Sequence, residues 1–437
     1  MSTPTPILIT GGRCLDPATG GDWEGDLYLD GGQIAPRPAQ CPAHTRVIDA
    51  KGCVVTPGLI DVHVHLREPG GEDAETIASG ALAAARGGVT TIVAMPNTLP
   101  PIDTPEHVQF VLEAGRRAEG ARVLTSACLT RGRAGREPAA LEELAAAGAV
   151  AFTDDGCTVQ DDQVMRVTME RASALGRPVM DHAQDHDMER QGGVMHAGLR
   201  SAQWRLPGIP AEAETRIVAR DLDLARATGV ALHIQHVSCG ASVDLIAAAQ
   251  AAGLPVTAEA TPHHLWWCED DIDPACPDAY KMNPPLRTAA DRARLQAAMS
   301  EGTLTLFATD HAPHPAAAKA RGFRAAPFGV VGLETAVGAT YTLLVHTGRM
   351  PLLNWLRAWT TAPAALLSRP APSLAPGQPA DVAVFDFATE WIVAPDQFAS
   401  RSRNTSFTGQ RLRGRAKAVV VDGCFIDTPW PACNNGD

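Results

Sequence analysis

From residue 59 to residue 310 the sequence alternates between short apolar runs and Ala-rich stretches, and this alternation constrains the fold most. The runs have strand length, and the stretches have helix length. Eight strands with crossover helices favour a (β/α)8 barrel of the TIM type over an open sheet. We expect strands at 59–65, 89–95, 122–128, 149–155, 178–183, 231–237, 255–260 and 303–310, and helices at 75–87, 105–119, 137–147, 161–175, 211–228, 241–252 and 290–299.

Both ends of the chain have a different sequence pattern, in which short expected strands are separated by turns rich in Gly and Asp. The 437 residues exceed the usual range of a single domain, which leaves room for a barrel and a smaller domain. We therefore expect residues 1–56 and 371–437 to build one small β-sandwich domain, and residues 57–370 to build the α/β barrel.

The bulk composition limits the partners of the protein. A net charge of -12 argues against nucleic acid or an anionic membrane as the main partner. The N-terminus lacks the features of a signal peptide, and no apolar run reaches the roughly 20 residues of a membrane helix. The 10 cysteines contain no Cys-x-x-Cys pair, which favours reduced thiols. These observations predict a cytoplasmic enzyme that acts on a small molecule.

Three common hydrolase designs find no support in the sequence. It contains no P-loop, no Gly-x-Ser-x-Gly nucleophile elbow and no His-Glu-x-x-His helix. Other chemistry must therefore be sought.

His63 and His65 stand at the end of the first expected barrel strand. Residues i and i+2 of a strand point to the same face, so the two imidazoles would converge. Converging imidazoles suit a metal ion, although two strand histidines that merely bond to the backbone would give the same pattern. Arg67, two residues further on, would point to the same mouth.

Four further candidate ligands stand where other expected strands end, namely Asp155, His182, His236 and Asp310. The C-terminal ends of barrel strands carry the chemistry in this architecture. Each residue alone has a structural explanation, but together they favour a metal site. Asp154 and Asp155 would point to opposite sides, and strand alternation alone does not choose between them.

These ligands are numerous enough for two metal ions. His63, His65 and Asp310 could hold one ion, and His182 and His236 a second. Many amidohydrolases bridge the two ions with a carboxylated lysine, yet the sequence has no lysine between Lys51 and Lys281. A carboxylate from the fourth strand is then the remaining candidate for the bridge.

The chain resembles the class I dihydroorotases, cyclic amidases of the amidohydrolase superfamily. The resemblance rests on motifs such as Asp61-Val-His-Val-His-Leu-Arg-Glu-Pro-Gly70 and Ala308-Thr-Asp-His-Ala-Pro-His314. Further matching stretches run through most of the chain, at 94–98, 152–156, 208–212, 236–238, 261–265, 281–287 and 327–335.

This resemblance implies a zinc-dependent dihydroorotase that cyclises N-carbamoyl-L-aspartate to L-dihydroorotate in pyrimidine biosynthesis. It implies two Zn²⁺ ions bridged by Asp155, and Asp310 as both ligand and catalytic acid and base. It further implies that Arg67, Asn97 and His314 hold the substrate carboxylate and that Asn283 holds the ring.

Two alternatives remain open. Allantoinases and hydantoinases share the fold, but they normally bring the carboxylated lysine that this sequence lacks. A non-catalytic dihydroorotase-like partner of aspartate transcarbamoylase would have lost ligands, whereas all six are present. Association with aspartate transcarbamoylase, or as a homodimer, is compatible with the resemblance. We expect structural roles for His186, His196, His233, His263, His264, Cys239 and Cys268.

Overall fold

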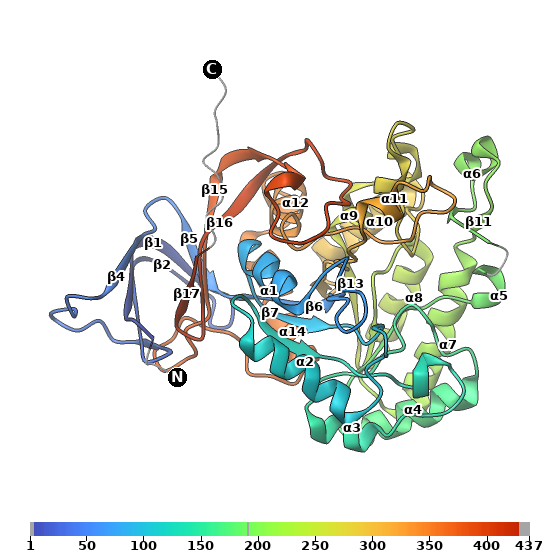
Figure 1. The fold of residues 1–437 in the computed structure, drawn as a ribbon, viewed down its shortest axis with the longest axis horizontal. Coiled ribbons are helices and arrows are strands. Elements are labelled where there is room, and N and C mark those ends of the chain that lie inside the picture. Colours follow the sequence, from blue (N-terminus) through green and yellow to red (C-terminus); the bar gives the residue numbers. More distant parts are fainter. Residues whose placement is uncertain (1–3, 190–191, 428–437) are drawn as a thin grey trace.

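A computed structural model describes residues 4–189 and 192–427 of the chain, so residues 1–3 and 428–437 of the expected end domains lie outside it. Strands from the two ends of the chain form one mixed sheet of eight strands, shown in blue and red at the left of Figure 1. The shared sheet confirms that both ends of the chain build one β structure. Its strands are β1 (Ile7–Asp16), β2 (Gly21–Asp30), β3 (Gln33–Ala35), β4 (Arg46–Asp49), β5 (Val54–Pro57), β15 (Val382–Ile392), β16 (Arg411–Val421) and β17 (Cys424–Ile426).

The middle of the chain contains two larger parallel sheets besides a short two-stranded one, which confirms the predicted α/β class. One has the order β6-β7-β8 and the other β14-β13-β12-β9. The strands are β6 (Leu59–Val64), β7 (Val89–Ala94), β8 (Arg122–Thr125), β9 (Val179–Asp181), β12 (Leu232–Ile234), β13 (Val256–Ala260) and β14 (Leu306–Phe307).

Single parallel bridges join these two sheets at both edges. Phe152 pairs with Ala127 on one side and with Val179 on the other. His311, which follows β14, pairs with Val64 of β6. The parallel pairings therefore return to the strand from which they start.

Helices separate most of these strands and carry clear start signals. Thr76 caps the first helix through a capping box with Ser79, and Thr104 caps the second with Pro105 at its first position. The long helices are α1 (Ile77–Arg86), α2 (Pro105–Arg117), α3 (Leu141–Ala147), α4 (Asp162–Ala174), α7 (Glu212–Thr228), α8 (Gly240–Ala251), α10 (Ala289–Glu301) and α13 (Leu352–Trp359).

Two apolar clusters occupy the two sides of the parallel strands. The larger one packs strand residues against the helices, with Trp355 and Trp359 of α13 fully buried. The smaller one gathers inward residues such as Ile60, Val62 and Met180 and is covered by α14 (Thr361–Leu366). Strand alternation explains this division, because successive side chains point to opposite faces.

Several expected elements are shorter in the structure. The expected strand at 149–155 contributes only the bridges at Phe152, and the one at 303–310 is reduced to β14. Helix α3 starts at Leu141 because Pro138 pairs with Thr130 instead. Small elements that were not expected are α5 (His186–Glu189), β10 (Met195–His196), α6 (Leu199–Trp204), β11 (Gly208–Ile209), α9 (Pro262–Trp266), α11 (Ala316–Lys319) and α12 (Ala336–Thr340).

Within the described ranges, none of the helices has both the length and the apolar character that crossing a membrane requires. Every described cysteine is a free thiol. The C-terminal ends of the parallel strands form a mouth, which is where side chains that carry chemistry stand in this architecture.

Candidate metal centre and substrate pocket

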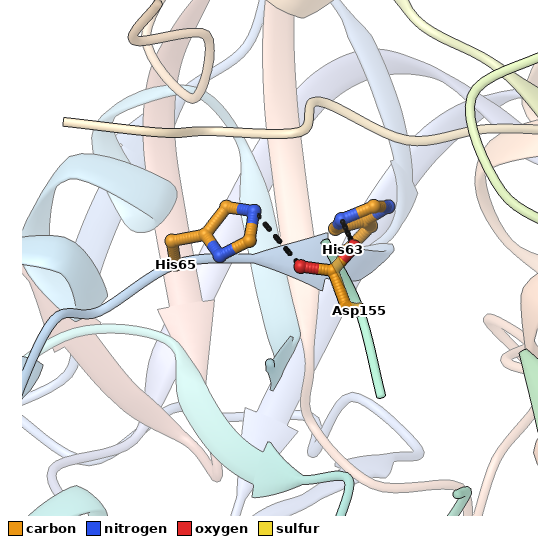
Figure 2. Close-up of side chains that lie close together, drawn as sticks. All are labelled: His63, His65 and Asp155. Atoms are coloured by element: carbon orange, nitrogen blue, oxygen red, sulfur yellow. Dashed lines mark ion pairs between the residues drawn. The ribbon is translucent and has the colours of Figure 1, made fainter. Parts of the chain in front are cut away.

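His63 and His65 turn their rings toward the carboxylate of Asp155 (Figure 2). Nε2 of His63 lies 3.4 Å from Oδ1 of Asp155, and Nε2 of His65 lies 3.7 Å from its Oδ2. All three side chains are buried. The donors of one candidate metal site are thus brought together from β6 and from the segment after Phe152.

Asp155 also belongs to a second triad, with His182 and His236. Nδ1 of His182 lies 3.8 Å from Oδ1 of Asp155 and 2.7 Å from Nε2 of His236. Two imidazole nitrogens at that distance need a shared proton or a cation between them. Two buried triads that share one carboxylate indicate a binuclear metal site, the arrangement that hydrolytic chemistry with two metal ions requires.

Asp154, the neighbouring carboxylate, forms hydrogen bonds with the loop at residues 129 and 130 instead. Its Oδ1 accepts backbone hydrogen bonds of 2.9 Å from Leu129 and 3.1 Å from Thr130. It occurs in neither of the two candidate groups in the described part of the chain. The choice that strand alternation left open therefore falls on Asp155.

Asp310 faces the first triad from the segment after β14. Its Oδ1 lies 3.0 Å from Nε2 of His65 and 3.6 Å from Nε2 of His63. Its backbone has φ of 46°, and Arg67 and His236 also have positive φ values, of 59° and 29°. Non-glycine residues rarely adopt this conformation, and such strain concentrates at functional sites.

The histidine and aspartate side chains of the two triads have the chemistry that a divalent metal ion requires. Nε2 of His63 and Nδ1 of His236 are buried and have no hydrogen-bond partner among the described residues. Burial raises the pKa of Asp155, but His63, His65 and His182 outweigh it and hold that pKa well below its ordinary value, so the carboxylate is ionised. The unpartnered Nε2 of His63, which faces this ionised carboxylate, suits zinc and similar borderline ions.

Arg67 and His314, both predicted to hold the substrate, lie at the same mouth. Nε of Arg67 donates a 3.2 Å hydrogen bond to the carbonyl of Pro313. Across residues 4–189 and 192–427, no partner is found for its two Nη groups, which leaves them for a ligand. Burial and the nearby Arg67 lower the pKa of His314 to about 3, and its Nε2 donates to the carbonyl of Phe328.

The two predicted asparagines contact metal-ligand candidates directly. Oδ1 of Asn97 accepts from Nδ1 of His65 at 2.9 Å, and its Nδ2 donates to Asp155 at 3.0 Å. Nδ2 of Asn283 lies 3.2 Å from Nε2 of His182, while its Oδ1 is buried without a partner among the described residues. Asn97 therefore supports the metal centre, which the sequence did not indicate.

Two buried acids that were not predicted from the sequence, Asp61 and Glu259, form hydrogen bonds with residues of the site. Asp61 accepts from the backbone N–H groups of His63 and Thr309, each at 3.2 Å, and so ties β6 to the segment that ends in Asp310. Glu259 of β13 lies 2.6 Å from Nδ1 of His63. A carboxylate on a buried strand is rare unless it has a partner. The acids at positions 61 and 259, within expected strands, could therefore have indicated from the sequence that each binds a nearby group.

The remaining histidines take supporting positions. His264 contacts Thr261 and the carbonyl of Pro284, next to Asn283. His196 lies 3.2 Å from Arg287, and His233 contacts Glu259. In the described chain, none of these three belongs to a candidate metal group, in line with the structural roles expected for them.

The fold has close counterparts among solved structures. The L-hydantoinase (dihydropyrimidinase) from Arthrobacter aurescens superposes with a TM-score of 0.84 at 25% identity, over 96% of this chain and 95% of that one. The dihydropyrimidinase from Brevibacillus agri gives a TM-score of 0.84 at 22% identity, a likeness of fold alone. Fold and site together define the class, a cyclic amidohydrolase with a candidate binuclear metal centre.

Sequence comparison narrows the class to one family. A family model described as dihydro-orotase-like matches residues 52–242. The dihydroorotase of Solibacter usitatus is 42% identical over 419 residues, which cover 96% of this chain and 97% of that protein. The dihydroorotase of Bacillus caldolyticus is 45% identical over 402 residues, or 92% and 94% of the two chains. The chain belongs to the dihydroorotase family, as the motifs predicted.

Proposed function

We propose that the protein is a dihydroorotase, which interconverts N-carbamoyl-L-aspartate and L-dihydroorotate plus water in pyrimidine biosynthesis. The observation that carries this proposal is the pair of buried triads sharing Asp155, with Arg67 beside them and its Nη groups without a partner among the described residues. A carboxylate-bearing cyclic amide needs both features, a centre that activates water and a cation that holds the carboxylate.

The architecture that we propose for the catalytic part is a (β/α)8 barrel over residues 57–370. The returning circuit of parallel pairings supports it, because a circuit without free edges is what a barrel requires. We propose that residues 1–56 and 371–437 build the small β domain. We further propose that Zn²⁺ is the ion in both metal sites. The donors, imidazole and carboxylate, agree with zinc.

In the mechanism, the two triads built from His63, His65, Asp155, His182 and His236 would hold divalent ions, which would make a water molecule more acidic and polarise the amide carbonyl. Asp310 accepts the proton of the attacking water as a general base. It then returns that proton to the departing ring nitrogen as a general acid, so that the C–N bond breaks and one water is consumed. Ring closure follows the same steps in reverse. The position of Asp310, 3.0 Å from His65, keeps its carboxylate at the metal centre.

For recognition, we propose that Arg67 pairs the substrate carboxylate through its two Nη groups. A planar guanidinium binds a carboxylate in bidentate fashion. His314 would line the pocket beside it, and Oδ1 of Asn283, which has no partner among the described residues, would accept from a ring N–H. Asn97 would contact the substrate from its place between His65 and Asp155.

A substrate comparison tests the proposal. Purified protein is assayed on L-dihydroorotate, hydantoin and allantoin, and we expect turnover of dihydroorotate to dominate, because only that substrate carries a carboxylate for Arg67. Arg67→Lys should raise KM about tenfold or more, because a lysine cannot replace the bidentate contact. Turnover of hydantoin or allantoin alone, with dihydroorotate inert, would replace this assignment by one of the two alternatives.

Asp310→Asn tests the proton transfer. The amide retains the shape of the side chain but cannot accept the proton, so we expect kcat to fall by about 10²–10⁴-fold. Bound metal, measured by elemental analysis, should stay close to that of the unaltered protein. Near-normal turnover would remove Asp310 from this role.

A further inference from the structure

Glu259 occupies an unusual place beneath the metal centre. It lies on β13, and its relative exposure is 0%. Burial of an unpaired carboxylate is strongly unfavourable, and an apolar residue would fill a strand position at less cost. The contacts of Glu259 must therefore compensate for the burial of its carboxylate.

The first oxygen of Glu259 contacts residues from both candidate metal triads. Oε1 lies 2.6 Å from Nδ1 of His63, and it also accepts a 3.0 Å hydrogen bond from the backbone N–H of His236. His63 belongs to one triad and His236 to the other. One oxygen atom thus contacts a member of each triad.

These contacts decide how each ligand is presented. Because Nδ1–H of His63 donates to Glu259, its Nε2 carries the lone pair, and that nitrogen is the buried one without a partner among the described residues. At His236 the contact falls on the backbone, whose φ of 29° lies in the left-handed region. A fixed acceptor helps to hold that strained conformation.

The second oxygen is held from the other side by His233. Oε2 lies 2.9 Å from Nε2 of His233, whose Nδ1 lies 2.8 Å from Oγ1 of Thr257. The parallel register of β12 and β13 pairs His233 with Thr257 and so fixes this arrangement. The carboxylate therefore has little freedom to rotate.

We propose that Glu259 is a positioning residue that sets the tautomer of His63 and the backbone of His236, and thereby prepares both metal sites together. His233 is its orienting partner. The inference rests on the proposed function, because it presumes that the two triads bind metal. It goes beyond that function in assigning metal affinity at both sites to a residue that is not itself a ligand.

The test compares Glu259→Ala and Glu259→Gln with Glu334→Gln as a matched control. Glu334 is also a buried glutamate that accepts backbone hydrogen bonds, from Ala399 at 2.8 Å and Ser400 at 3.2 Å, but it lies outside both candidate metal groups of the described chain. Metal-free protein is titrated with Zn²⁺ against a chelator, and the Co²⁺-loaded protein is examined by absorption spectroscopy. The unfolding of each metal-free variant is measured in parallel.

We expect Glu259→Ala to weaken Zn²⁺ binding at both sites by about 10–100-fold, as loss of a ligand's orienting partner usually does. Glu259→Gln should weaken it by about tenfold, because the amide oxygen still accepts from His63 and His236 but carries no charge. The Co²⁺ spectrum should change in both variants and remain unchanged in Glu334→Gln. If Glu259→Ala does not fold, Glu259→Gln alone decides the question.

The experiment distinguishes a failure of the proposed function from a failure of the role proposed for Glu259. If the unaltered protein binds no metal, the proposed function is wrong and this inference falls with it. If the unaltered protein binds Zn²⁺ tightly and the Glu259 variants bind it equally well with the same Co²⁺ spectrum, only the positioning role is overturned. A loss of stability in the metal-free variants with unchanged affinity has the same meaning, since Glu259 would then be purely structural.

Discussion

Nδ2 of Asn97 donates a 3.0 Å hydrogen bond to Oδ2 of Asp155, the carboxylate that both metal triads share. Oδ1 of the same amide accepts from Nδ1 of His65. Asn97 thus orients two ligand candidates at once, in addition to the substrate contact predicted from sequence. Its loss should therefore affect the metal centre as well as the substrate.

For Asn97→Ala we expect both a higher KM and a metal affinity lowered by about tenfold or more, because His65 and Asp155 lose an orienting partner. Chelator competition and steady-state kinetics measure the two effects separately. Thr98→Ala, next in the chain and bonded to the carbonyl of Pro100, serves as the control. A raised KM with unchanged metal affinity would restrict Asn97 to the substrate.

Asn404 joins the C-terminal part of the chain to the substrate side of the mouth. Its Oδ1 accepts from the backbone N–H of His314 at 3.2 Å, and its Nδ2 donates to the carbonyls of Ala312 and Gly329. Asn404→Ala should loosen this loop and raise KM by about tenfold with a smaller change in kcat. Steady-state kinetics on dihydroorotate provide the check, and an unaltered KM would count against the role of the loop.

Glu75 should make stability sensitive to acid. Burial raises its pKa, but His311 at 3.1 Å, Ser400 and Ser79 outweigh burial and lower the pKa from 4.5 to about 2. A carboxyl whose pKa is lower in the folded state stabilises the fold above its unfolded pKa, and that stabilisation is lost as the pH falls from 4.5 to about 2. The full effect is about 3 kcal/mol.

Glu75→Gln removes this titration. The difference in unfolding free energy between the two proteins should therefore shrink as the pH falls from about 5 toward 2. Denaturant unfolding at several pH values, with both proteins under identical conditions, gives this difference. A gap that stays constant over the range would show that Glu75 does not titrate as described.

The sequence pointed to the candidate ligands because they stand where the expected strands end, and the parallel strands bring those ends to one mouth. His63 and His65 share a face through their spacing of two, and the same spacing places Arg67 nearby. Asp155 could not be separated from Asp154 by alternation, since the segment after Phe152 is a turn in the structure and not a strand. Only the hydrogen bonds of Asp154 to Leu129 and Thr130 show that it serves the loop.

Other parts of the site depend on contacts between residues distant in the chain. Glu259 meets His63 across 196 positions, and Asn404 meets His314 across 90. Local periodicity carries no information on such pairs. The same holds for the expected strand at 149–155, where Phe152 makes one bridge to Ala127 and one to Val179, both distant from it in the chain. The buried acids in β6 and β13, Asp61 and Glu259, were the visible signs of this support.

Metal content measured on two matched variants, Asp155→Asn and Asp154→Asn, tests the shared carboxylate most directly. Both changes replace one buried acid by its amide at adjacent positions. We expect two ions per chain in the unaltered protein and in Asp154→Asn, which should lose only stability, by about 1–3 kcal/mol. Asp155→Asn should lose most of both ions and its turnover of dihydroorotate. Two tightly bound ions in Asp155→Asn, or metal loss confined to Asp154→Asn, would contradict a metal centre built around Asp155.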